Sequence, residues 1–413
     1  MANLYVIDDD FVLPDRGDEQ DGPEKAVPAG DPDETVRLFH RYRQLTAEIL
    51  GFEDEFPGPA SEEDIAEAEE DLGFALPPDL RALYGIADGE GHQINSLFDR
   101  WEWFSLADLG DEDDEWLDIS QEWQYEPWRR TLFDARVPNA VRRSALRPGW
   151  IRFAFDTGGN WLALDMDPGP EGRPGQVIAV GVDFGDGPAY VADSVTTFLR
   201  RLVEALERGD HRQHDRSLWI EADLPHEPGG HGVYSDGPPS LERAGQAEQA
   251  GPRVQEVRVT EVEDCAFLGA LPDVLSLTLS GEGSPDLAPA GDRPVEYLRL
   301  DVESADLTGP ARNPQLRSLS ITCTRPVDLA PLRASPSLWA LDIAGASVAD
   351  LRTVARLKGL RFLAVTLEQW RELSELDDLP PLAVVGVHPD RPHPDSRDRT
   401  NWKVVHGEPP TER

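Results

Sequence analysis

Three kinds of residue in this sequence have the chemistry for metal binding, catalysis or phosphate binding: histidine pairs, acidic clusters and a glycine pair. The histidines form three close pairs in loop-like segments, namely His211 and His214, His226 and His231, and His388 and His393. A zinc site requires three or four ligands on a rigid frame, with further hydrogen bonds that orient them. We therefore expect solvated histidines, no metal ion and no cofactor.

The acidic residues follow the pattern of a solvated surface. Residues 52–71 contain ten acids and no base, and residues 108–118 contain seven acids and no base. A general acid–base pair needs pKa values tuned by burial or by neighbouring charges, whereas Glu69, Glu70 and Asp71 follow the polar side of an amphipathic helix. Gly158 and Gly159 precede no helix, so they predict a turn and not a phosphate cradle. The sequence predicts a protein that is not an enzyme.

The net charge restricts the class of partner. The chain carries 39 basic and 79 acidic residues, a formal charge of −40. The negative electrostatic field of such a chain repels nucleic acid and anionic lipid and attracts a basic protein. A general acidity of the proteins of the source cell would explain the same net charge. No run of 18 apolar residues and no secretory signal is present. We expect a cytoplasmic protein with a protein partner, and the oligomeric state stays open.

The first half of the chain alternates helix signals and strand signals. Helical periodicity begins near Asp33, and Ser61 with Asp64 predicts a second helix that stops at Gly73. Pro77 and Pro78 open a third helix. Strands are predicted on both sides of the turn at residues 156–160 and again at 177–180, followed by a closing helix at 194–207. These elements predict an α+β domain.

At residues 31–210 the sequence resembles the SUKH superfamily, which includes yeast cell-wall-synthesis regulators and many bacterial toxin-immunity proteins. The resemblance is carried by Ile65, Glu69, Leu72-Gly73, Leu76-Pro77, Asp79-Leu80, Leu83-Tyr84, Asp88-Gly89, Trp150, Phe153, Asp156, Gly158-Gly159, Leu164-Asp165, Gly175 to Ile178, Ser194, Phe198 and Leu199. It implies a SUKH-like α+β fold, with helices packed on a mainly antiparallel sheet, and a role in binding protein.

The second half repeats an apolar template, L-x-x-L-x-L. Its clearest copies begin at Val295, Leu316, Leu338, Leu360 and Leu382, in steps of 21, 22, 22 and 22 residues. The pattern resembles an α/β leucine-rich-repeat solenoid. At the ninth position, where many such repeats have Asn or Cys, this chain has Glu303, Thr324, Ala346 and Glu368. Tyr297 and Phe362 are expected on the concave side as aromatic anchors, although a merely structural solenoid is an equal alternative.

These patterns predict the following domain boundaries: an acidic, disordered N-terminus at residues 1–30, a SUKH-like domain at 31–210, a linker at 211–252, a leucine-rich-repeat-like domain at 253–388 and a flexible tail at 389–413.

Two functions follow from the resemblance. The first is a bacterial immunity protein that binds and neutralises a basic toxin domain. The alternative is an intracellular scaffold or regulator, for example of cell-wall synthesis, with the partner chosen by the repeats. The contact residues expected are Glu63, Glu67, Glu70, Asp88, Gly89, Asp111, Glu112, Asp113, Asp114, Glu115, Tyr297 and Phe362. The identity of the partner, and whether both domains bind one target, stay open.

Overall fold

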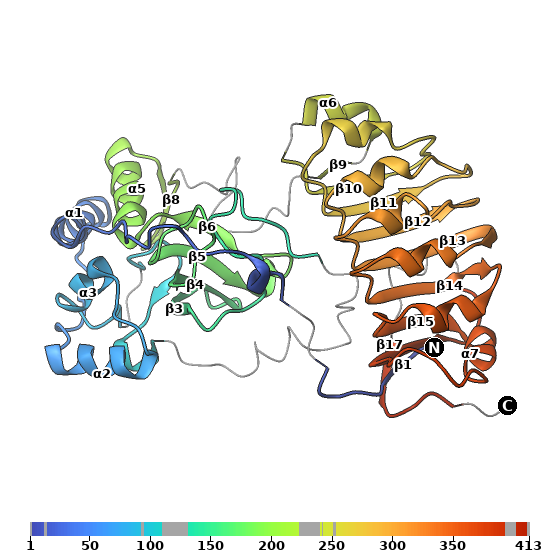
Figure 1. The fold of residues 1–413 in the computed structure, drawn as a ribbon. Coiled ribbons are helices and arrows are strands. Elements are labelled where there is room, and N and C mark those ends of the chain that lie inside the picture. Colours follow the sequence, from blue (N-terminus) through green and yellow to red (C-terminus); the bar gives the residue numbers. More distant parts are fainter. Residues whose placement is uncertain are drawn as a thin grey trace. The chain divides into compact units, whose positions relative to one another are not determined.

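The computed structural model describes residues 2–11, 15–91, 95–109, 131–222, 240–241, 243–250, 253–392 and 402–410. They divide into two compact units (Figure 1). Residues 15–109 and 132–222 form what we call the helix–sheet unit. Residues 2–11 and 240–410 form the repeat unit. In the sequence, the helix–sheet unit is therefore inserted between the first strand of the repeat unit and the remainder of that unit.

The helices of the helix–sheet unit begin and end at the expected signals. They are α1 (Pro32–Leu50), α2 (Glu62–Leu72), α3 (Pro78–Tyr84) and α5 (Val195–Arg208). Glycines in the left-handed region end three of them: Gly51, Gly73 and Gly209 have φ angles of 77°, 70° and 81°. A residue without Cβ adopts this conformation at little cost. The predicted helices are confirmed.

A five-stranded antiparallel sheet forms the centre of this unit. Its order is β2 (Glu102–Trp103), β3 (Trp150–Phe155), β4 (Asn160–Asp165), β5 (Gln176–Gly181) and β6 (Ala189–Ala192). The turn between β3 and β4 is held by Asp156, whose Oδ1 accepts hydrogen bonds from the backbone N of Gly158 at 2.7 Å and of Asn160 at 3.0 Å. The predicted hairpin is confirmed.

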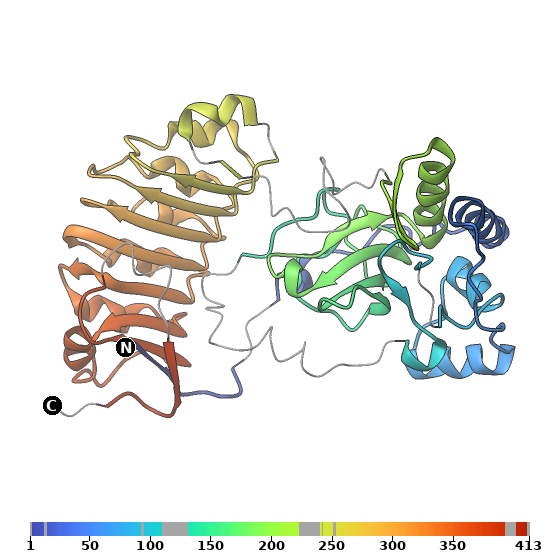
Figure 2. The same ribbon diagram turned by 180° about the vertical axis from the view of Figure 1, so that it is seen from behind.

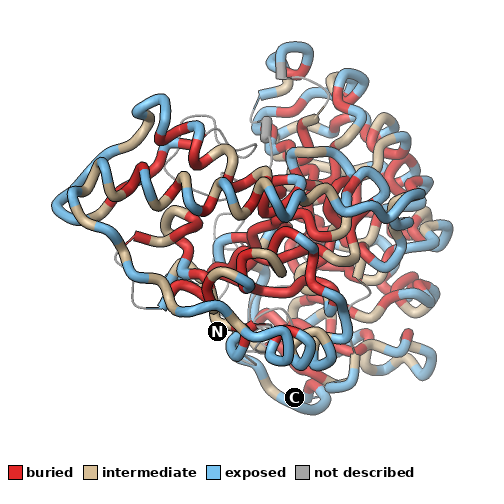
Figure 3. The backbone as a smooth tube through the Cα atoms, turned by 90° about the vertical axis from the view of Figure 1, so that its left-hand side faces the viewer, coloured by how far each residue is buried: buried red, intermediate tan, exposed pale blue. Residues whose placement is uncertain are grey.

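The two faces of this sheet pack against different material. One face joins the apolar sides of the helices in a single core, represented by Phe39, Leu80 and Phe198. The other face, which includes Trp161 and Ile178, packs against apolar side chains from residues 135–146. Figure 3 shows buried backbone along the strands and exposed residues along the outer turns. Apolar burial on both faces is what stabilises the sheet.

A buried carboxylate joins the first turns of three helices. Asp79, in α3, is fully buried. Its Oδ2 accepts two hydrogen bonds from Thr196, one from the backbone N at 3.0 Å and one from the side-chain Oγ1 at 3.1 Å. Thr196, in α5, also lies 2.7 Å, Oγ1 to Oγ1, from Thr35 of α1. Helix N-termini carry partial positive charge and unpaired N–H groups. The carboxylate thus satisfies donors that would otherwise be buried without partners.

The predicted linker is wrong for residues 211–222. Strands β7 (His211–His214) and β8 (Ser217–Ile220) form a hairpin. Leu218 and Ile220 are buried in the core of the helix–sheet unit. Asn95 fixes the hairpin, because its Oδ1 accepts from the backbone N of Leu218 at 2.8 Å. The alternation of Leu218 and Ile220 was the signal for a half-buried strand.

The repeat unit contains a ten-stranded, mainly parallel sheet (Figure 2). Its order is β17 (Trp402–His406), β1 (Ala2–Val6), β16 (Val384–His388), β15 (Phe362–Thr366), β14 (Ala340–Val348), β13 (Ser318–Val327), β12 (Tyr297–Val302), β11 (Ser276–Ser280), β10 (Glu256–Val259) and β9 (Ser240–Leu241). Two short helices, α6 (Ala247–Ala250) and α7 (Leu367–Leu373), accompany it. The chain as described is therefore of mixed α and β content.

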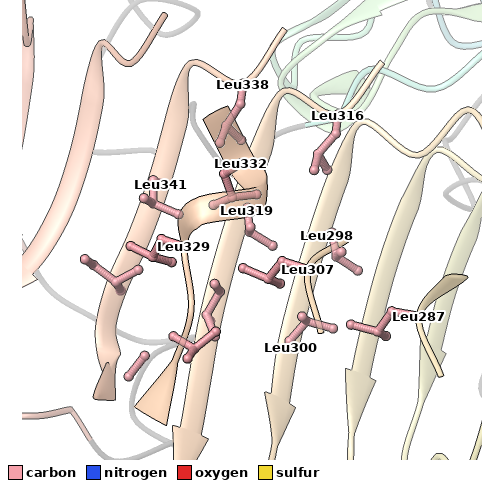
Figure 4. Close-up of a cluster of buried hydrophobic side chains, with 14 of the residues drawn as sticks. Leu287, Leu298, Leu300, Leu307, Leu316, Leu319, Leu329, Leu332, Leu338 and Leu341 are labelled. Carbon is pink, nitrogen blue, oxygen red and sulfur yellow. The ribbon is translucent and has the colours of Figure 1, made fainter. Parts of the chain in front are cut away.

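The repeated leucines stack in register behind this sheet. Leu298 lies opposite Leu319, and Leu319 lies opposite Leu341, in neighbouring parallel strands. Figure 4 shows these side chains together with Leu307 and Leu329 from the return segments. One repeat cannot bury its apolar side alone, so stacking on the next repeat completes the core.

The turn chemistry of the repeats differs from the expected one. Five aspartates, one per repeat, accept a hydrogen bond from the backbone N two residues later, at 2.8–3.2 Å; they are Asp264, Asp286, Asp306, Asp328 and Asp350. Each initiates the return segment of its repeat. In this chain an Asx-turn therefore forms the turn, and the asparagine that many such repeats have at the ninth position is absent.

The expected disorder at both ends is wrong for the residues described there. Strand β1 pairs antiparallel with β16, Asn3 lying opposite Val387, and parallel with β17, Leu4 lying opposite Val404. Both β1 and β17 had been placed outside the repeat domain. Arg391, also in the predicted tail, donates from Nε to the carbonyl oxygen of Gly345 at 3.0 Å. Local composition did not reveal these distant partners.

Candidate protein-binding surfaces

Helix α2 presents the acidic residues singled out in the sequence. Ser61 is its N-cap: the backbone N of Asp64 donates to Ser61 Oγ at 3.1 Å, and the backbone N of Ser61 donates to Asp64 Oδ2 at 3.1 Å. Ile65 is buried in the core. This reciprocal cap and one apolar anchor fix the helix so that its other face is left to solvent.

The acids of α2 divide into two groups. Glu62 and Glu69 form ion pairs with Arg81 of α3, at 2.5 and 3.1 Å, and Glu69 Oε1 also accepts from the backbone N of Leu76 at 3.0 Å. These two hold α2 against α3. The other group is Glu63, Glu67 and Glu70, which are exposed and take part in no ion pair within the described ranges.

We call Glu63, Glu67 and Glu70, together with Phe74, the α2 surface. The three glutamates are four and three residues apart, a spacing that places them along one side of a helix. Phe74 follows the C-cap Gly73 and is 37% exposed, which is unusual for a large aromatic side chain. The sequence reasoning overlooked Phe74, although an apolar residue directly after a helix-ending glycine was visible.

The Asp88–Gly89 turn is engaged in contacts inside the helix–sheet unit. Asp88 Oδ1 accepts from the backbone N of Leu106 at 2.8 Å. Gly89 is buried with a φ of 75°, and a Cβ there would lie 2.6 Å from the backbone N of Ser105. The turn therefore connects two segments of the domain; the selection of Gly89 as a partner contact was wrong, whereas Asp88 is half-buried and stays a prediction.

The neighbouring Glu90 is a buried acid that sequence reasoning also overlooked. It is 2% exposed, and its Oε2 accepts from the backbone N of Trp103 at 2.9 Å. Burial raises the pKa of the Glu90 carboxyl to about 7, because desolvation outweighs the hydrogen bonds that favour the charged form. Its oxygen atoms are engaged by donors of the surrounding loop, so its role is to hold that loop.

The predicted aromatic anchors of the repeat unit are buried. Phe362 is 0% exposed and belongs to a small core with Leu4, Val6 and Val384. Phe11 and Trp339 pack against the same core. Tyr297 is 8% exposed. The selection of both as exposed anchors was wrong: Phe362 is covered by segments distant in sequence, and Tyr297 is buried on β12.

The remaining predicted contacts, Asp111, Glu112, Asp113, Asp114 and Glu115, lie outside the described residues.

Among the residues that are described, no group of three or more His, Cys, Asp or Glu side chains could hold a metal ion. His388, expected in solvent, is buried on β16 with its ring 4.7 Å from that of Trp402.

No helix in the described ranges has both the length and the apolar composition needed to cross a bilayer.

Comparison with known families yields a match inside the helix–sheet unit. Residues 59–201, about a third of the 413-residue chain, match the SMI1/KNR4 family (SUKH-1). The match includes α2, the Asp88–Gly89 turn and strands β3 to β5. It supports the resemblance predicted from the sequence for this part of the chain.

Three curated relatives each match part of this chain. A glucan synthesis regulatory protein of Neurospora crassa is 30% identical over 178 residues, covering 35% of this chain and 33% of the relative. A cell wall biosynthesis and cell cycle regulator of Schizosaccharomyces pombe is 31% identical, covering 35% and 31%. A cell wall assembly regulator of Saccharomyces cerevisiae is 25% identical, covering 37% and 36%. The chain thus spans about a third of the length of these relatives.

These relatives are named as regulators and not as enzymes. Their names support the alternative function predicted from the sequence better than the immunity function that was ranked first. Among solved structures, an internalin from Listeria monocytogenes aligns at a TM-score of 0.28 and 19% identity, covering 40% of this chain and 51% of that chain. At that score the likeness carries no argument.

Proposed function

Starting from the SMI1/KNR4 match at residues 59–201, we propose that this chain is a non-enzymatic regulator or scaffold that binds another protein through its helix–sheet unit. The observation that carries the proposal is the α2 surface, which lies within the matched residues. Glu63, Glu67 and Glu70 are not needed for the ion pairs that hold α2 in place. Their charge is therefore available to a partner.

The chemistry of the α2 surface favours a basic partner. Three carboxylates along one helix side produce a local negative field that steers a cationic surface toward it. Exposed charge pairs contribute about 0.2–1 kcal/mol each, so charge alone gives modest affinity. Phe74 adds an exposed aromatic side chain, the type of residue that supplies much of the energy at interfaces. The regulatory role in cell-wall synthesis comes from the named relatives and is part of this proposal.

We propose further that the repeat unit is a leucine-rich-repeat-like solenoid that serves as the scaffold. The support is one parallel strand every 20 to 22 residues, with leucines in register between strands. Strands β10 to β12 carry exposed or half-exposed polar side chains, such as Arg258 and Thr278. Because the side of the sheet at β15 and β16 is covered, selection of a partner by the repeats would use the β10–β12 end.

Site-specific photo-crosslinking tests the proposal. A photoreactive amino acid is placed at position 67 of the full chain, in cells that express it, and at position 372 as the matched control. Glu372 is an exposed glutamate on helix α7 of the repeat unit. We expect a discrete protein adduct from position 67 that is absent from position 372. The adduct should disappear when Glu63 and Glu70 are changed to lysine. Identical adducts from both positions would overturn the proposal.

A further inference from the structure

Two deeply set arginines of the helix–sheet unit hold a segment that precedes α1. Arg142 Nη1 donates to the carbonyl oxygen of Gly17 at 3.0 Å and also to that of Gln20. Arg147 Nη1 donates to Asp18 Oδ1 at 3.0 Å. The segment, residues 15–20, lies outside the family match, whereas both arginines lie inside it.

Two further contacts complete the attachment. Ser144 Oγ donates to Asp15 Oδ2, and the backbone N of Arg143 donates to Gln20 Oε1 at 2.7 Å. The side chains of Arg142 and Arg147 are only 11% and 12% exposed. The segment DRGDEQ contains no apolar side chain, so hydrogen bonds and ion pairs hold it. Polar contacts of this kind are exchangeable, because another carboxylate can make the same hydrogen bonds to the two guanidinium groups.

The arginines are fixed in place independently of this segment. Asp167 accepts from both of them: its Oδ1 lies 3.0 Å from Arg142 Nε and its Oδ2 lies 2.6 Å from Arg147 Nη2. Asp167 is itself oriented by the buried Asp165, whose Oδ1 accepts from the backbone N of Asp167 at 3.0 Å. Gln176 Nε2 donates to Asp165 Oδ2 at 2.9 Å. The guanidinium groups are thus preorganised on the end of β4.

The charges of the site are incomplete without the segment. Two guanidinium groups face one carboxylate, Asp167, and the carboxylates of Asp15 and Asp18 add the negative charge that more than balances them. Gly17 allows the close approach, since a Cβ there would lie 2.7 Å from Arg147 Nη1. Two neighbouring, largely buried guanidinium groups are opposite in sign to the net charge of the chain, which is −40. Arginine forks bind carboxylates with well-defined geometry.

We propose that Arg142, Ser144 and Arg147 form a receptor site for an acidic peptide whose carboxylates are three residues apart, and that residues 15–20 occupy it as an internal ligand. An acidic segment of a partner protein competes with residues 15–20 for the arginines. The site is separate from the α2 surface and opposite to it in charge, so it adds a second, self-occupied docking position to the domain.

The test uses the full chain and a fluorescent peptide of residues 14–22. Asp15→Asn with Asp18→Asn loosens the internal ligand, and anisotropy measures binding of the peptide. We expect binding at least tenfold tighter than to the wild type, because the added peptide no longer competes with a tethered copy of itself. Asp21→Asn with Glu24→Gln, two exposed acids outside the contact, is the matched control and should bind as the wild type does.

Two further arms keep the test decisive. A peptide with both aspartates replaced by asparagine should not bind to the loosened variant, and the bound acidic peptide itself shows that this variant is folded. Arg147→Ala added to the loosened variant should abolish binding of the acidic peptide, with circular dichroism reporting whether that variant is folded. Equal binding of the wild type and the loosened variant, or equal binding of the two peptides, would overturn the proposal. Neither result affects crosslinking from position 67, so the two proposals fail separately.

Discussion

At the scale of single residues, the acids of this chain differ in role according to burial. Glu63 and Glu67 are exposed and carry charge outward. Asp79, Glu90 and Asp165 are buried and organise hydrogen bonds inside the helix–sheet unit. Burial raises the pKa of the Asp165 carboxyl to about 7. Buried carboxylates of this kind are expensive to remove, because their donors are left without partners.

Asp79→Ala should destabilise the helix–sheet unit strongly. The substitution leaves the Thr196 backbone N and the Leu80 backbone N without the carboxylate that accepts from them. We expect the free energy of unfolding to fall by about 3 kcal/mol, since each buried unsatisfied donor costs about 1–3 kcal/mol. Chemical denaturation measures it. Asp71→Ala, at an exposed position of α2, is the control and should change stability by less than about 0.5 kcal/mol; an equal loss in both variants would contradict the assigned role.

Glu90→Gln should change how stability depends on pH. The folded pKa of about 7 lies above the ordinary value of 4.5, so the stability that protonated Glu90 contributes is complete below about pH 4.5 and is lost as the pH rises through 7. Two and a half pKa units correspond to about 3 kcal/mol. Between pH 5 and pH 8 the wild type should therefore lose about 2–3 kcal/mol relative to the variant, in denaturation measured at each pH. A difference that does not vary with pH would refute the shifted pKa.

The roles of these buried acids could not be predicted from the sequence. Asp79 was recognisable as part of a family motif, but the donor to Asp79 lies 117 residues away, at Thr196, and Glu90 was not singled out in the sequence at all. From the residue type alone, an acidic side chain is expected at the protein surface. The exposed stripe of α2 was predictable, because four- and three-residue spacing within one helix is a local property.

At the scale of elements, capping explains where the helices and the repeats begin. Ser61 and Asp64 start α2, and one aspartate per repeat starts each return segment. The repeated aspartate was present in the sequence at steps of 20 or 22 residues, as Asp286, Asp306, Asp328 and Asp350. Its role went unrecognised because attention was on the ninth position of each repeat, where the usual asparagine is absent from this sequence. Register between strands was predictable from leucine spacing, whereas the chemistry of the turn was not.

Asp328→Ala should weaken one repeat locally. Its Oδ1 accepts from the backbone N of Ala330 at 2.9 Å, and loss of such a cap costs about 1 kcal/mol. Thermal unfolding should show a lower transition for the repeat unit and an unchanged one for the helix–sheet unit. Asp377→Ala, at an exposed aspartate outside these turns, should leave both transitions in place. A variant at 328 as stable as the wild type would show that the turn forms without its Asx bond.

At the scale of the whole molecule, the chain order differs from the order of folded units. The first strand, β1, completes the sheet of a unit whose other strands follow residue 239. Leu4 is fully buried against the core that contains Phe362 and Val384. Sequence periodicity reports on neighbours within a few turns or strands, so the pairing of Asn3 with Val387 could not be predicted. The same pairing removes Phe362 from the surface.

Leu4→Asp should therefore destabilise the repeat unit and spare the helix–sheet unit. A charge placed in an apolar core without a partner costs several kcal/mol. Hydrogen exchange should show lost protection in β15 and β16, with β3 to β5 unchanged. Lys403→Asp, at an exposed position of β17, is the control and should leave β15 and β16 protected. Loss of protection in β3 to β5 would contradict the division into two units.

The central claim is that the α2 surface binds a basic protein. Its most direct test is the affinity of the full chain for the protein that crosslinks to position 67. Glu63→Lys, Glu67→Lys and Glu70→Lys together should weaken binding about threefold to a hundredfold, since the loss of three exposed pairs amounts to about 0.6–3 kcal/mol. The matched triple Glu372→Lys, Glu375→Lys and Asp378→Lys should bind as the wild type does. Equal affinity of all three proteins would contradict the account.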